Sequence, residues 1–289
     1  MPEVKALLVF CEGAHDVAFV GQVFKLCLDF QKVEWKFSEY PAPFNSLFKT
    51  SVQNHAAKDL SLDMTHKFFL PDCVFKKGDD LILVFNSGGS SQVDKVKKLL
   101  KNFLTLLSQS TVFPDNSNTI VTQAKYLFLY DADHIGTKAL FSKIKQDFLI
   151  IDDEPTWSFS NFVLSNNPFG AIAKDKAAYI WSINSENGTL EDILLPMFEK
   201  DQENLIEKAT NFVNSSVFVW ETEHIKLKNR FAEIAARKKA IITCAGQREK
   251  TGSSMNVIIG QAKLISDNTF LNNDSVKAFV GFIKQFAAI

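Results

Sequence analysis

The sequence is poor in cysteine, tyrosine and tryptophan, and it has no excess of charge of either sign. Its four cysteines form neither a CxxC pair nor a zinc-type spacing, which excludes a zinc ribbon and a disulfide framework. Lys and Arg number 32 and Asp and Glu number 33, so the formal net charge is −1. This balance excludes a broadly basic protein that wraps nucleic acid by neutralising many phosphates, but it permits a local basic patch.

Long hydrophobic runs are also missing. No run approaches the ~20 apolar residues that a membrane-spanning helix needs, and the N-terminus shows no secretory signal pattern. We therefore expect a soluble cytoplasmic protein with free thiols and no membrane partner. Phenylalanine, in contrast, is abundant, with 27 residues against 4 Tyr and 4 Trp, which indicates a substantial apolar core.

The first 200 residues alternate between strand-like and helix-like patterns, which is typical of an α/β sheet with parallel strands. Apolar runs predict strands at residues 6–11, 33–37, 81–85, 126–130 and 178–183. Helical spacing predicts helices at residues 16–28, 93–107 and 137–148, and another that begins near residue 189. The segment 40–78 holds three of the eight prolines and has no clean period, so we interpret it as an insertion with one short helix.

From residue 201 onward the pattern is helical without a convincing strand. The length allows one large domain or two of ordinary size. We predict an α/β domain at residues 1–200, with helices on both faces of a largely parallel sheet. Residues 201–289 are predicted to form a helical C-terminal extension packed on it.

Acidic side chains follow three of the predicted strands. These are Glu12 and Asp16 after the first strand, Asp131 and Asp133 after the fourth, and Glu191 and Asp192 after the fifth. In open α/β sheets, ligands bind beyond the carboxyl ends of the strands. Neighbouring carboxylates repel one another, and a divalent cation commonly offsets this repulsion. Oxygen-only ligands favour Mg²⁺ or Mn²⁺ over zinc.

The spacing of Asp131 and Asp133 places both side chains on one face if the strand continues. A structural role also fits several of these residues. Asp16 can cap the helix that follows it, and Thr189 and Asp192 have the spacing of a capping pair. Any single residue fits either interpretation equally well, but packing does not require carboxylates at three separate strand ends, and this favours a site.

The order of these motifs resembles that of the Toprim domain. Glu12-Gly13-x-x-Asp16 follows an apolar strand and Asp131-x-Asp133 follows a later one. Asn86-x-Gly88-Gly89 lies where many Toprim domains have a glycine-containing turn. Leu190-Glu191-Asp192 is similar to the additional acidic motif of the OLD (overcoming lysogenization defect) nucleases. The resemblance covers roughly residues 4–200.

The resemblance implies a Toprim-like, Rossmann-type sheet and metal-dependent phosphodiester chemistry. It implies metal-binding roles for the carboxylates of Glu12, Asp16, Asp131, Asp133, Glu191 and Asp192. Glu12 would in addition act as a general acid or base. Two Mg²⁺ or Mn²⁺ ions about 4 Å apart would suit in-line cleavage of a phosphodiester.

Several parts of related proteins are missing from this sequence. It has no GxxxxGK[ST] motif, so the ATPase that accompanies Toprim in OLD proteins would be a separate partner. It also lacks the tyrosine context of a topoisomerase and the zinc-ribbon cysteines of a primase. These absences favour a nuclease or nickase acting on DNA or RNA. The alternatives are a non-catalytic module that binds nucleic acid or a partner ATPase in phage defence, and a phosphotransfer enzyme acting on a small nucleotide.

A basic segment lies in the C-terminal part. From Lys226 to Lys250 there are eight basic residues and two acidic ones, a charge that can hold phosphates, although such runs are also typical of solvated helix faces. OLD-like nucleases use a lysine near the metal site. Lys250, beside a Gly/Ser turn, is the first candidate for this catalytic role, and Lys239 is the second. The nucleic-acid-binding candidates are Lys238, Lys239, Arg248 and Lys250.

Overall fold

The computed structural model describes residues 3–56, 69–89, 92–112, 119–154, 156–160, 163–164, 169–183, 186–215 and 230–289. The strands are β1 (Glu3–Cys11), β2 (Gln31–Val33), β3 (Cys73–Lys77), β4 (Asp80–Asn86), β5 (Ile120–Asp131), β6 (Val163–Leu164), β7 (Gly170–Ala173) and β8 (Lys176–Trp181). The helices are α1 (Ala14–Gln22), α2 (Phe44–Ala56), α3 (Val93–Val112), α4 (Thr137–Asp147), α5 (Leu190–Val213), α7 (Arg230–Gly246), α8 (Met255–Gln261), α9 (Asp267–Asn272) and α10 (Asp274–Ala287), with a π-helical turn η1 (Val23–Cys27) and a 3₁₀ turn η2 (Phe37–Glu39).

All eight strands form one sheet in the order β2-β3-β4-β1-β5-β8-β7-β6. The four central strands β4, β1, β5 and β8 are parallel. The outer strands pair antiparallel, β3 and β2 at one edge and β7 and β6 at the other. The predicted α/β class is therefore confirmed. The carboxyl ends of the four central strands lie at the same end of the sheet, which we call its carboxyl edge to distinguish it from the outer strands.

β1 shows why the sequence forms a central strand. Its side chains alternate between two cores, Leu7 and Val9 on one face and Leu8 and Phe10 on the other, and all four are buried. A strand that is covered on both faces needs an uninterrupted apolar run rather than an alternation of apolar and polar residues. This run was the strongest strand signal in the sequence.

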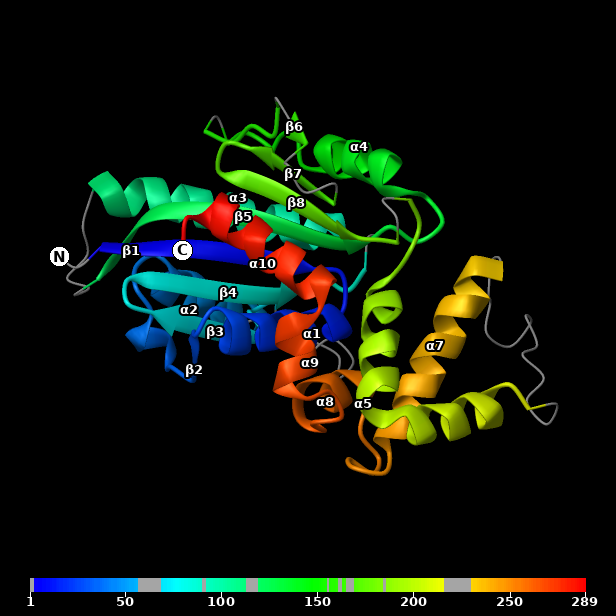
Figure 1. The fold of residues 1–289 in the computed structure, drawn as a ribbon. Coiled ribbons are helices and arrows are strands. Elements are labelled where there is room, and N and C mark those ends of the chain that lie inside the picture. Colours follow the sequence, from blue (N-terminus) through cyan, green and yellow to red (C-terminus); the bar gives the residue numbers. More distant parts are fainter. Residues whose placement is uncertain are drawn as a thin grey trace.

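Helices cover both faces of the sheet (Figure 1). One core joins the sheet to α2, α3 and α4. The other core joins it to α1, α5 and α7 and to the C-terminal helices α8, α9 and α10. The C-terminal part thus packs on the sheet, as expected, and contributes to the same core as α1.

The predicted insertion at 40–78 contains the expected helix, α2, and it also contains strand β3, which sequence patterns did not indicate. Part of this segment, residues 57–68, lies outside the described residues. The strand expected at 33–37 lies earlier, at Gln31–Val33. Strands β6 and β7 were also missed, because two residues and the sequence GAIA carry no strand periodicity of their own.

Helix α5 crosses the predicted boundary between residues 200 and 201. Its backbone leaves the helical conformation at Gln202, with φ −137° and ψ 38°, so the boundary coincides with a kink. After residue 201 the described residues contain helices and no strand, in agreement with the sequence pattern. Within the described part of the chain, no helix is both long and apolar enough to span a membrane.

Candidate functional site

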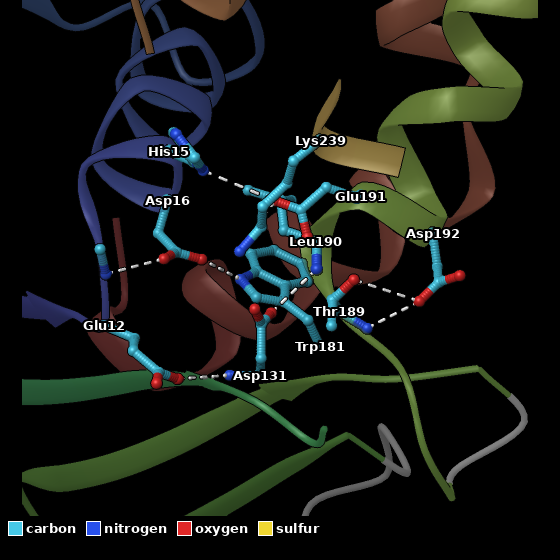
Figure 2. A network of polar contacts seen from close by, with 11 residues as sticks. Glu12, His15, Asp16, Asp131, Trp181, Thr189, Leu190, Glu191, Asp192 and Lys239 are labelled. Atoms are coloured by element: carbon cyan, nitrogen blue, oxygen red, sulfur yellow. Dashed lines mark hydrogen bonds and ion pairs between the residues drawn. The ribbon is translucent and has the colours of Figure 1, made fainter. Parts of the chain in front are cut away.

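Four carboxylates from three strand ends meet at the carboxyl edge of the sheet (Figure 2). Glu12 follows β1 and Asp16 lies in the first turn of α1. Asp131 is the last residue of β5, and Glu191 lies in the first turn of α5, which follows β8. We call these four residues the acidic cluster. Their meeting follows from the parallel central strands, whose carboxyl ends share one edge.

Backbone N–H groups orient two of these carboxylates. Glu12 Oε2 accepts a hydrogen bond from the backbone N–H of Asp131 at 3.1 Å. Asp131 Oδ1 in turn accepts one from the backbone N–H of Leu190 at 2.8 Å. Leu190 is the first residue of α5, and the free N–H groups of a helix N-terminus favour negative charge. The carboxylate of Glu12 therefore links the end of β1 to β5, and the carboxylate of Asp131 links β5 to the start of α5.

Gly188 shapes the turn that delivers α5 to this position. Its φ is +143°, a conformation that other residues rarely adopt, and a Cβ atom there would lie 2.7 Å from the backbone nitrogen of Ile183. Only glycine fits such a close approach of two backbone segments. The backbone N–H of Asp133 donates to the carbonyl of Gly188 at 2.9 Å, which joins this turn to the end of β5.

Asp16 is buried, and both of its oxygens accept hydrogen bonds. Oδ2 accepts from the backbone N–H of Gly13 at 2.9 Å, which caps α1, and Oδ1 accepts from Trp181 Nε1 at 3.1 Å. The predicted capping role of Asp16 is thus confirmed. Trp181, the last residue of β8, is a member of the site that sequence reasoning missed; the only signal was an indole at the end of an apolar strand.

Burial, together with crowding of like charges, raises two pKa values in the cluster. Burial, followed by the charge of Glu12, raises the pKa of Asp16 to about 7. Burial and the charges of Asp16, Glu191 and Glu12 raise the pKa of Asp131 well above its usual range, although the Leu190 N–H opposes this. A shared proton or a cation would relieve the repulsion among these groups.

Glu191 has the opposite shift. Burial opposes its ionisation, but the hydrogen bond from His15 and the charge of Lys239 outweigh this and lower its pKa. His15 Nδ1 lies 3.5 Å and Lys239 Nζ 3.7 Å from Glu191 Oε1. The other oxygen, Oε2, is buried without a hydrogen-bond partner. Glu191 is therefore ionised and has one oxygen that no protein donor satisfies.

The unpaired oxygen of Glu191 is one of three such atoms in the described residues, together with Ser87 Oγ and Ser182 Oγ. Ser87 follows β4 and Ser182 follows β8. All three atoms therefore lie at the carboxyl edge of the sheet. Buried polar atoms without partners are rare in folded proteins, and a strained or functional position is a common reason for them.

Lys239 of α7 is the lysine that reaches the acidic cluster. Burial lowers its pKa, but the charges of Glu191, Asp131 and Asp16 outweigh this and raise it. The side chain as a whole is 44% exposed. A permanently charged lysine in this position is suited to contact a phosphate group that approaches the cluster.

Asp192 and Lys238 form a separate pair beside the cluster. Asp192 Oδ2 accepts hydrogen bonds from the backbone N–H and the hydroxyl of Thr189, at 2.8 and 3.2 Å. Its other oxygen accepts from Lys238 Nζ. The capping interpretation of the Thr189–Asp192 spacing is confirmed, and Lys238 joins α7 to the start of α5.

Asp133 does not share the face of Asp131 in the way that a continuing strand would require. β5 ends at Asp131, and the backbone of Asp133 is left-handed, with φ 49°. Burial raises the pKa of Asp133, with opposing contributions from Lys239 and His134. Asp133 therefore lies within the electrostatic reach of the site but is placed there by the turn rather than by strand alternation.

The basic segment divides into two parts. Lys238 and Lys239 lie in α7 beside the carboxylates. Lys250 lies after the end of α7, and the seven residues of α7 that follow Lys239 extend about 10 Å along the helix axis. In the Gly/Ser turn after α7, the backbone N–H of Gly252 already donates to Gln247 Oε1 at 2.7 Å. Arg248 pairs with its neighbour Glu249 at 3.6 Å. Lys226 and Lys228 lie outside the described residues.

The acidic cluster is not a ready-made coordination sphere. In the described ranges, no group of three or more His, Cys, Asp or Glu side chains is arranged to hold a metal ion. The four cysteines are free, Cys11 being buried. A cation at this edge would therefore be bound through a local adjustment of the carboxylates.

Fold and site together define an α/β protein with an excess of buried and half-buried carboxylates at the carboxyl edge of a central parallel sheet. Residues 6–288 match the family described as a protein of unknown function, DUF3226, so the chain belongs to that family. No curated protein matches the chain. A solved structure, a hypothetical protein from Pyrococcus horikoshii OT3, is similar at 11% identity and a TM-score of 0.48, over 98% of this chain and 95% of that one.

Proposed function

We propose that this chain is a divalent-metal-dependent nuclease or nickase of the Toprim type, acting on DNA or RNA in the cytoplasm. The observation that carries the proposal is the acidic cluster, which gathers carboxylates from three strand ends, Asp16 and Glu191 among them buried. Burial and the neighbouring charges raise the pKa values of Asp16 and Asp131. Charge crowding of this kind is costly for stability and is typical of functional sites.

The donor set fits Mg²⁺ or Mn²⁺, because every candidate ligand is a carboxylate oxygen. Glu191 Oε2, buried and without a hydrogen-bond partner, supplies an oxygen that a cation can satisfy. The residues that would hold the metal are Glu12, Asp16, Asp131 and Glu191, with Asp133 close by. When bound, the metal would activate the attacking oxygen and stabilise the leaving oxygen of a phosphodiester.

The protein's own groups would orient the substrate and move protons. Glu12, held by the N–H of Asp131, would accept a proton as the general base. Lys239 would bind a non-bridging phosphate oxygen, since its ammonium group adjoins the carboxylates and its side chain is partly exposed. Among the two candidate lysines we therefore favour Lys239 over Lys250 for the catalytic role.

The test is cleavage of supercoiled plasmid and of single-stranded RNA by the purified chain with Mn²⁺. We expect activity that Asp131→Ala and Glu12→Ala abolish and that Glu207→Ala, which removes an exposed carboxylate of α5, leaves unchanged. Absence of cleavage, or activity that survives both cluster substitutions, would contradict the proposal.

A second candidate function is a non-catalytic module that binds nucleic acid or a separate ATPase. It is supported by the ion pairs of Lys239 with Glu191 and Lys238 with Asp192, which already neutralise part of the negative charge. Calorimetric titration with Mn²⁺ separates the two functions. A nuclease binds the cation at micromolar concentration and loses this binding in Asp131→Ala, whereas an inert module shows no such heat.

A further inference from the structure

A cavity of about 280 Å³ lies between the helices that carry the acidic cluster and the C-terminal helices. Its walls come from α1, η1, α5, α8 and α9. Five of its lining side chains are apolar and buried: Leu194, Phe198, Ile258, Leu264 and Phe270. A volume of this size and an apolar wall are typical of sites for small organic ligands.

The rim of the cavity carries more positive than negative charge. Lys25 and Lys263 line it, together with a single carboxylate, Asp267. Both lysines are exposed. Neither lysine forms a salt bridge within the part of the chain that the structure describes. An anion at the rim would therefore not have to displace an existing ion-pair partner.

Irregular backbone supplies both lysines. Lys25 belongs to the π-helical turn η1, and such turns occur frequently at functional sites. Lys263 follows Ala262, the C-cap of α8, and has the left-handed backbone with which helices commonly end, with φ 51°.

We propose that this cavity binds a small amphipathic carboxylate. Its aliphatic body would lie against the partly exposed apolar lining residues Leu26, Ile259 and Ile265, where burial away from water stabilises it. Its carboxylate would lie at the rim between Lys25 and Lys263, where charge-assisted hydrogen bonds are available. The proposal is independent of the nuclease activity, because none of these residues belongs to the acidic cluster.

Two glycines offer a matched test. Gly260 lines the cavity, and a Cβ atom there would meet no atom within 4 Å. Gly281 in α10 has the same open surroundings and lies outside the cavity. We expect octanoate, titrated calorimetrically into the full chain, to bind the wild type and Gly281→Leu alike, and to bind Gly260→Leu at least tenfold more weakly.

The charge requirement is tested with a double variant, Lys25→Gln with Lys263→Gln. Because both side chains are exposed, the variant keeps the fold, and its thermal melt serves as the check. We expect octanoate binding to weaken about tenfold while binding of the neutral 1-octanol is unchanged. No binding of octanoate to the wild type, equal binding by the two leucine variants, or equal weakening of octanol would each overturn the proposal.

Discussion

The two ends of β8 bury charge in opposite ways. At its amino end, the ammonium group of Lys176 is 2.6 Å from Asp175 and lies over the ring of Trp157 at 4.4 Å. Tyr126 presents a second ring at 5.8 Å, so one buried cation is matched by one carboxylate and two aromatic faces. At the carboxyl end, Trp181 donates a hydrogen bond to Asp16, one of the four carboxylates of the acidic cluster. Among the described residues, Lys239 is the lysine whose charge acts on this cluster.

The two ends of the strand differ in charge balance, which we use to distinguish a structural charge from a functional one. In a matched pair, the attraction between opposite charges offsets part of the cost of removing them from water. Carboxylates in excess repel one another and hold protons that they would lose in water, so they persist where a ligand uses them. Under the proposed function, the balanced charges at the amino end of the strand contribute to stability, and the unbalanced carboxylates at its carboxyl end are the candidates for chemistry.

The largest effect is expected from Glu191→Gln, which keeps the shape of the side chain and removes its charge. Cleavage should fall by about 10²–10³-fold, as when one stabilising group is removed from an active site. The neighbouring substitution Asp192→Asn should lower stability by about 1 kcal/mol through the loss of a helix cap and change activity less than threefold. Initial cleavage rates measure the activity of the two variants, and urea melts measure their stability. Equal losses of activity would contradict the assignment of Glu191 to the site and of Asp192 to the helix cap.

The next effect concerns the two lysine candidates. Lys239→Ala should lower cleavage by about 10–100-fold, since it removes the ammonium group that faces Glu191 and Asp131 and leaves their charge less compensated. Lys250→Ala should leave the rate within about twofold, because Lys250 lies beyond the end of α7. If cleavage were lost in Lys250→Ala and not in Lys239→Ala, Lys250, beside the Gly/Ser turn, would be the catalytic lysine.

A pH dependence follows from the raised pKa of Asp16, about 7. Mn²⁺ must displace the proton, so its affinity should rise about tenfold per unit from pH 5.5 to 6.5 and level off above pH 8. The free energy of unfolding, measured in EDTA, should instead decrease as the pH rises. The folded state holds this proton and the unfolded state releases it near pH 4, so stability falls as pH rises from about 4 to 7.

Calorimetry at three pH values and urea melts in EDTA measure these slopes. Asp16→Asn removes one of the two carboxylates with raised pKa values, the other being Asp131. It should reduce both slopes, while Glu207→Gln leaves them as in the wild type. Metal affinity that is independent of pH in the wild type would show that Asp16 is not a ligand.

Much of the central architecture could be predicted because its signals are local. The apolar runs around Leu8 and Leu83 are buried on both faces, and burial on both faces is what a continuous apolar run indicates. Parallel strands then place Glu12 and Asp131 at one edge without any knowledge of the packing. The edge strands β6 and β7 could not be predicted, because their conformation comes from pairing with β8 rather than from their own residues.

The details of the site depend on contacts between distant segments. Asp133 leaves the strand because its backbone pairs with Gly188, 55 residues later in the sequence. The preference for Lys239 over Lys250 rests on how α7 packs against α5, for which the sequence carries only a basic run. The contact of Trp181 with Asp16 joins β8 to α1 across 165 residues. Each of these features is set by tertiary packing, so a local pattern could not indicate it.

The smallest effect is expected at the balanced end of the sheet. Lys176→Met keeps the apolar length of a side chain that is almost fully buried and removes its charge, which leaves Asp175, 32% exposed, able to bind water. The free energy of unfolding should fall by about 1–2 kcal/mol from the lost cation–π contact and ion pair, as measured by urea denaturation. Cleavage and Mn²⁺ affinity should be unchanged, because the substitution lies at the opposite end of β8 from the acidic cluster. A change in metal affinity in this variant would show that the two ends are coupled and that charge balance alone does not separate structure from function.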